Sequence, residues 1–84
     1  MRLDKYLKVS RLIKRRTVAN EACDTSRVTV NGRNAKASYD VKIGDEITVV
    51  FGSKSVTIRV LEIKETTKKA ESQGMYEVVS ETNA

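Results

Sequence analysis

Lys14, Arg15 and Arg16 are three consecutive cations at the point where the downstream pattern predicts the start of a helix. The N–H groups at a helix N-terminus together carry roughly half a positive charge, so cations there are repelled unless an anion is bound. Phosphate is a suitable anion, because backbone N–H groups and guanidinium groups can donate to its oxygens together. The cluster therefore indicates a phosphate-binding site.

Positive charge is concentrated in the first half of the 84-residue chain. Residues 1–42 hold eleven of the sixteen Lys and Arg and four of the eleven Asp and Glu, a net charge of +7. Residues 43–84 hold the other five cations and seven acids, a net charge of −2. Such a polarised charge predicts a surface that binds a polyanion.

Residue types that catalysis and metal binding need are scarce. The chain has no His and a single Cys, which excludes an imidazole base, an internal disulfide and the usual Cys/His zinc site. We expect one small non-catalytic domain without metal or cofactor, in which Cys23 is a buried apolar thiol. No apolar run approaches the ~18 residues of a membrane span and no signal peptide begins the chain, so a cytoplasmic protein without a membrane partner is expected.

Two short amphipathic helices are predicted in the basic half. Residues 2–8 place Leu3, Tyr6 and Leu7 at the i, i+3, i+4 spacing of an apolar stripe, which predicts that Tyr6 is a core residue. The polar side of this helix holds Arg2, Asp4, Lys5 and Lys8. The second helix, over residues 15–24, has a stripe of small apolar residues at Val18, Ala19, Ala22 and Cys23. The link over residues 10–13 is short enough for the cations of both helices to converge.

From residue 27 the period changes to two, which predicts strands. The Asn31–Gly32 dipeptide is a strong hairpin signal between a strand at 28–30 and a partner at 35–37. After a loop over 40–45, strands are predicted at 46–51, 55–63 and 75–79, with residues 65–73 as a loop or a helical turn. A single domain over residues 1–79 and a frayed tail over 80–84 complete the predicted organisation.

Two features near the hairpin have alternative interpretations. Asn and Gly suit a tight turn for purely structural reasons, but Arg33 and Lys36 flank the turn and could bring it to a nucleic acid. Tyr39 lies in a polar loop, where it is a better candidate than Tyr6 for stacking on a base, although a structural role is favoured.

Several short motifs, in their order and spacing, resemble the S4-type RNA-binding domain, named after ribosomal protein S4. The motifs are R-L-D-K-Y-L, S-R-L, R-R-T at the second helix, R-V-T-V-N-G and V-K-I-G-D-E-I, and they cover residues 2 to about 50. The V-x-F-G-x-K-x-V-T-I-x-V hairpin and the T-T-K-K-A-E-S-Q-G-M-Y-E-V-V ending resemble small stand-alone bacterial members related to heat-shock protein fifteen.

The resemblance implies an α+β fold of two short packed helices against a small, bent, mostly antiparallel sheet of about five strands, the alpha-L motif. It implies RNA contacts through cations and helix N-terminal N–H groups, by shape rather than by base edges. Many members have Ser where Arg15 stands, so the second helix must be capped in another way. By position, the RNA-binding residues are Arg2, Lys5, Arg11, Lys14, Arg15, Arg16, Thr17, Asn31, Gly32, Arg33 and Lys36.

For function, the resemblance implies a monomeric factor on the large ribosomal subunit that still carries peptidyl-tRNA. Such factors bind ribosomal RNA and assist alanine tailing of stalled nascent chains in ribosome-associated quality control, together with the tailing protein RqcH on the same particle. The alternative is a general binder of ribosomes or structured RNA in assembly or in the heat-shock response.

Three other classes fit the sequence less well. An RNA-modifying enzyme would need a catalytic domain beyond the point where this sequence stops. A sulfur-carrier or ubiquitin-like protein would need a C-terminal Gly-Gly, where this sequence has Glu-Thr-Asn-Ala. A helix-turn-helix DNA-binding protein would need base-reading side chains on its second helix, whereas Asn20, Glu21 and Asp24 there are neutral or acidic.

Overall fold

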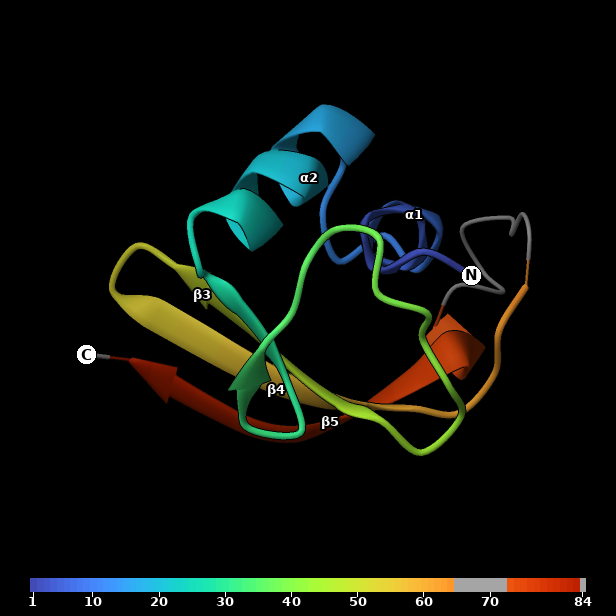
Figure 1. The fold of residues 1–84 in the computed structure, drawn as a ribbon. Helices are drawn as coiled ribbons and strands as arrows, with labels where there is room; N and C mark the ends of the chain where they lie inside the picture. The colour runs from blue at the N-terminus through green and yellow to red at the C-terminus, as the bar shows by residue number, and fades with distance from the viewer. Residues whose placement is uncertain (65–72, 84) are drawn as a thin grey trace.

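Two helices lie on one face of a five-stranded antiparallel sheet in the computed structural model, which describes residues 1–64 and 73–83 (Figure 1). The helices are α1 (Leu3–Val9) and α2 (Arg16–Asp24). The sheet has the strand order β2-β1-β3-β4-β5. Its strands are β1 (Val28–Val30), β2 (Arg33–Asn34), β3 (Glu46–Phe51), β4 (Lys54–Val60) and β5 (Tyr76–Asn83), with the short 3-10 helix η1 (Gln73–Met75) before β5. The predicted α+β fold is confirmed.

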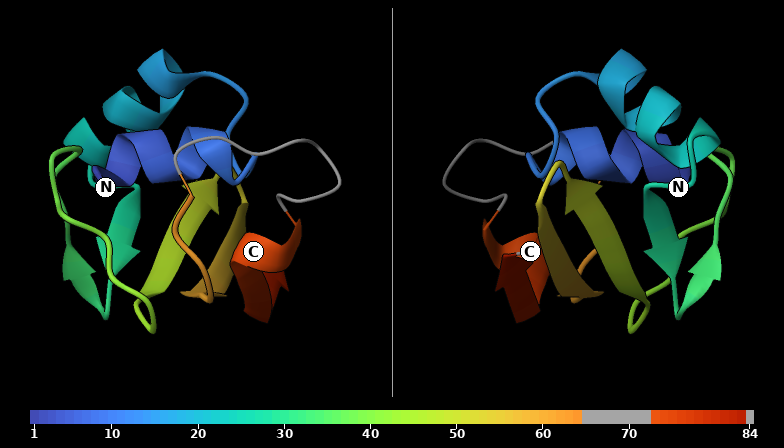
Figure 2. Two further views of the ribbon diagram at one scale, coloured as in Figure 1. Left: turned by 90° about the vertical axis from the view of Figure 1, so that its right-hand side faces the viewer. Right: turned by 90° about the vertical axis from the view of Figure 1, so that its left-hand side faces the viewer.

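The core lies between α1 and the sheet. Both views of Figure 2 place α1 over the strands, with α2 beside it. The apolar stripe of α1 is fully buried against residues of alternating strand positions such as Ile47 and Ile58. Tyr6 is a core residue, as predicted, and its hydroxyl donates to the Met75 carbonyl at 2.9 Å. This bond satisfies the only polar atom of a ring that is otherwise held by packing.

The loop over residues 35–39 caps α1 with backbone groups. The N–H of Leu3 donates to the Tyr39 carbonyl at 2.8 Å, and the N–H of Asp4 donates to the Ala37 carbonyl at 3.2 Å. The Arg2 side chain makes no cap, although Arg2 is the N-cap residue. The first turn of α1 therefore fixes this loop in place.

The β1–β2 hairpin has the predicted turn but a different partner strand. Asn31 and Gly32 have φ angles of 53° and 83°, as a two-residue turn between Val30 and Arg33 requires. The partner strand is Arg33–Asn34 and not residues 35–37. The strand ends early because Ala37 turns inward, where it is 5% exposed, and its carbonyl accepts the bond from α1.

In the C-terminal half of the sheet, the bounds predicted for one strand are confirmed and those predicted for two strands are corrected. β3 has the bounds that the sequence predicted, whereas β4 begins at Lys54 and ends at Val60 rather than spanning residues 55–63. β5 continues to Asn83, so the predicted frayed tail is corrected for residues 80–83. Its polar end is held by pairing with β4, as in Ser80 opposite Thr57 and Thr82 opposite Ser55. The predicted loop or helical turn at 65–73 lies outside the described residues except for Gln73, the first residue of η1.

α2 buries a narrower stripe than predicted. Ala19 and Cys23 are buried, but Val18 is 48% exposed, because only one side of this short helix packs on α1. The prediction of a buried thiol is confirmed, and burial raises the pKa of Cys23 to about 11. Within residues 1–64 and 73–83, no helix is long and apolar enough to cross a membrane, and no group of three or more acidic or Cys side chains could hold a metal ion.

Candidate nucleic-acid interface

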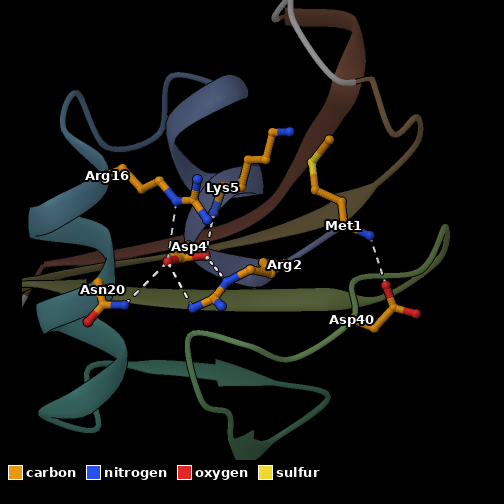
Figure 3. A network of polar contacts seen from close by, with 7 residues as sticks. All are labelled: Met1, Arg2, Asp4, Lys5, Arg16, Asn20 and Asp40. Carbon is orange, nitrogen blue, oxygen red and sulfur yellow. Dashed lines mark hydrogen bonds and ion pairs between the residues drawn. The ribbon is translucent and has the colours of Figure 1, made fainter.

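A buried carboxylate, Asp4, organises the cations of both helices. The side chain of Asp4 is 3% exposed and lies between α1 and α2, facing Arg2, Arg16 and Asn20 (Figure 3). Its Oδ1 accepts from Arg2 Nε at 3.1 Å and from the Lys5 N–H at 2.8 Å. Its Oδ2 accepts from Asn20 Nδ2 at 3.3 Å, and Arg16 Nε lies 3.4 Å from the same oxygen. Asp4 thus holds Arg2, the residue before α1, and Arg16, the first residue of α2, at one place.

The sequence placed Asp4 on the exposed polar side of the first helix, and the structure corrects this prediction. α2 and the loop over 35–39 cover that position, which the pattern of α1 alone could not show. Burial by itself would raise the pKa of Asp4, but the bonds from Arg2, Asn20, the Lys5 backbone and Arg16 outweigh it and lower the pKa. The carboxylate is therefore ionised at neutral pH.

The N-terminus of α2 has no side-chain cap. Arg15 occupies the N-cap position, and the first backbone bond of the helix runs from the Ala19 N–H to the Arg15 carbonyl at 3.0 Å. The amides of residues 16–18 precede that bond and are the donors that a helix leaves to an external acceptor. Lys14, Arg15, Arg16 and Thr17 are all exposed around them. Amides and side chains arranged in this way could bind a phosphate, and the phosphate site stays a prediction.

Replacing Arg15 with serine is expected to stabilise the unbound protein by about 0.5–1.5 kcal/mol, because serine supplies a capping hydroxyl and removes a cation from a helix N-terminus. RNA affinity is expected to stay level or fall, since one phosphate partner is lost. Thermal unfolding and RNA binding measured on the same preparation test the prediction. A lower melting temperature in Arg15→Ser than in the wild type would contradict it.

Three adjoining hollows form what we call the basic groove along this face. The first is lined by Asp4, Arg16, Thr17 and Asn20. The second shares Asn20 with the first, includes Arg2, and reaches Asn34 and Lys36 across the loop over 35–39. The third shares that loop and extends to Arg33 and Asn31 on the hairpin. The groove therefore brings together predicted RNA-binding residues from the helical region and from the hairpin region, namely Arg2, Arg16, Thr17, Asn31, Arg33 and Lys36.

Asn31 and Gly32 serve the structure of the hairpin. The Asn31 amide donates from Nδ2 to Asp45 Oδ1 at 3.1 Å, and its Oδ1 accepts from the Glu46 N–H at 3.0 Å. Both polar atoms of the side chain are thus used within the protein. Gly32 adopts the left-handed φ that the turn requires. Of the hairpin candidates, Arg33 and Lys36 are the exposed cations.

Two further candidates, Lys5 and Arg11, are not among the residues that line the groove. Lys5 is half-buried on α1, where its backbone N–H donates to Asp4 (Figure 3). Arg11 is exposed in the turn between the helices, with a φ of 64°. The sequence reasoning missed Asp4 and Asn20 as the residues that position the arginines. The one sequence signal for this role was the position of an acidic residue, Asp4, between the cations Arg2 and Lys5.

Comparison with known proteins identifies the family to which this fold belongs. The S4 domain family matches residues 1–47. The chain belongs to the S4 domain family. The match runs from α1 to the start of β3, and every residue that lines the basic groove lies within it. The resemblance predicted from the sequence motifs is confirmed.

The similarity to known proteins extends over nearly the whole length of the chain. The chain is 62% identical over 81 residues to the RQC P-site tRNA stabilizing factor of Bacillus subtilis (strain 168), covering 96% of this chain and 94% of that protein. It is 57% identical over 82 residues to the factor of the same name from Streptococcus pneumoniae (strain ATCC BAA-255 / R6), covering 98% and 93%. The trimeric structure of Vibrio cholerae Heat Shock Protein 15 matches with a TM-score of 0.89 at 33% identity, covering 95% and 82%.

Proposed function

We propose that this S4 domain is a non-catalytic RNA-binding factor of the large ribosomal subunit that carries peptidyl-tRNA. The observation that carries the proposal is its near full-length similarity to proteins named for stabilizing a P-site tRNA. The basic groove supports it, because the phosphates of tRNA and ribosomal RNA require such cations.

Within this role, we propose that the protein acts in the cytoplasm as a monomer and assists alanine tailing of stalled nascent chains. An RqcH-type tailing protein on the same particle would be its partner. The support for this finer assignment is the RQC name of the relatives, combined with the small size of the chain.

The helix part of the groove can bind a phosphate backbone without base-specific contacts. The ion pair with Asp4 uses Nε of Arg16, which leaves the two terminal nitrogens of this guanidinium for phosphate oxygens. The amides at the start of α2 have no side-chain cap, so they can donate to a phosphate bound there and fix its orientation. Because Arg2 and Arg16 are held by one carboxylate, little conformational entropy is lost when they bind.

Co-sedimentation with purified large ribosomal subunits tests the proposal. The protein is expected to recover with subunits that carry peptidyl-tRNA and much less with vacant subunits. Equal recovery with both would favour the alternative of a general ribosome binder, and recovery with neither would overturn the proposed function. The same chain with Arg59→Ala is the control for nonspecific charge, since Arg59 lies on β4 outside the basic groove.

A further inference from the structure

The hairpin end of the basic groove opens into a hollow of about 620 Å³ between the β1–β2 hairpin and the loop over residues 35–39. Its lining combines one aromatic ring with cations and small polar groups. Its lining residues include Arg33, Asn34, Lys36, Ser38 and Tyr39. We propose that this hollow holds one unpaired nucleotide of the bound RNA, with its base stacked on the Tyr39 ring and its phosphate between Arg33 and Lys36. The proposal rests on the proposed function and names the RNA feature that the groove selects.

The Tyr39 ring is fixed before any ligand arrives. Its hydroxyl donates to Asp45 Oδ2 at 2.8 Å, and Asp45 is held in turn by Asn31 and by the Lys42 N–H at 3.0 Å. The backbone is fixed as well, since the Tyr39 carbonyl accepts from Leu3 at the start of α1. A ring restrained in this way offers a stacking surface at a small cost in conformational entropy.

The charges around the hollow favour a nucleotide over a peptide side chain. Within the described part of the chain, Arg33 and Lys36 form no ion pair with a carboxylate, so both are left for an anion. Asn34 and Ser38 add amide and hydroxyl groups that can bond to the edge of a base. An aromatic platform beside cations is the combination that binds single-stranded nucleic acid. A paired base could not enter, because its face is covered by its neighbours in the helix.

Binding to large subunits that carry peptidyl-tRNA, measured with Tyr39→Leu and Tyr39→Phe, tests the proposal. Loss of the ring in Tyr39→Leu is expected to weaken binding roughly tenfold. Tyr39→Phe keeps the ring and loses only the bond to Asp45, so it is expected to bind within about threefold of the wild type. Equal losses in both variants would mean that the hydroxyl bond is what matters, which would overturn the stacking role.

Ultraviolet cross-linking of the wild-type complex gives a readout that does not depend on how a variant folds. A nucleotide joined to the peptide over residues 33–39 is expected, and that nucleotide is expected to be unpaired in the RNA. A cross-link map without this peptide, or with a base-paired nucleotide on it, would overturn the proposal while leaving the proposed function intact. Failure of the wild-type protein to bind any subunit would overturn the proposed function as well.

Discussion

Replacing Asp4 with asparagine is expected to lower the free energy of unfolding by about 2–3 kcal/mol, because the bonds that the buried carboxylate accepts are charge-assisted. For a domain of this size, such a loss corresponds to a melting temperature lower by about 10–20 °C. The cost stays below that of a broken, fully buried ion pair, because the side chains of Arg2 and Arg16 are about half exposed and water can solvate them.

Asp40→Asn is the matched control for this experiment. The Asp40 side chain is 75% exposed and pairs with the N-terminal amine at 2.8 Å, so its replacement is expected to change the melting temperature little. Equal effects of the two substitutions would contradict the role assigned to Asp4.

The stability that the Asp4 carboxylate contributes should also appear in the pH dependence of unfolding. The pKa of Asp4 is lowered in the folded protein from a usual value of 3.8, so its ionised form stabilises the fold above that value. This contribution is lost as the pH falls below about 4 toward the folded pKa. The Asp4→Asn protein should therefore lose less stability than the wild type between pH 5 and pH 2. Some acid dependence should remain, because the pKa of Asp45 is lowered as well.

Arg16→Ala is expected to weaken binding to large subunits that carry peptidyl-tRNA by about 1–3 kcal/mol, because a charge-assisted phosphate contact is lost. The protein should still fold. The side chain of Arg16 is 49% exposed and Asp4 keeps its other donors, so the stability change should stay within about 1 kcal/mol. Binding and thermal unfolding measured together separate the two effects.

Arg59→Ala is the matched control for Arg16→Ala. Arg59 is the same residue type, its side chain is 42% exposed, and it pairs with Glu77 at 2.7 Å and Glu46 at 3.4 Å. It lies on the face of the sheet away from the helices, since its neighbours Ile58 and Val60 are buried in the core. A loss of stability in Arg16→Ala without a loss of affinity would make Arg16 a structural residue.

Local sequence signals predicted the elements that depend on local chemistry. The turn signals at Gly44–Asp45 and at Gly52 predicted the bounds of β3. The apolar stripe of α1 and the Asn31–Gly32 turn were likewise readable, because spacing and positive φ angles are encoded over a few residues. The S4-type resemblance supplied the topology that these signals could not.

The features that were missed depend on contacts between distant segments. Asp4 is buried among partners that include Arg16 and Asn20 of α2, which lie far from it in the sequence. Residues 80–83 look like a polar tail, yet they are ordered by hydrogen bonding to β4 and not by apolar alternation. Val18 has the spacing of a buried residue but stays 48% exposed on the side of α2 away from α1. In each case the tertiary partner, and not the local pattern, decides the outcome.

The salt dependence of binding tests most directly that the basic groove contacts RNA phosphates. If about five to seven phosphates are neutralised, the slope of log K against log salt concentration for subunits carrying peptidyl-tRNA should be about −4 to −6. Arg16→Ala should make the slope shallower by about one, and Arg59→Ala should leave it unchanged. A slope near zero, or equal changes in the two variants, would contradict the account.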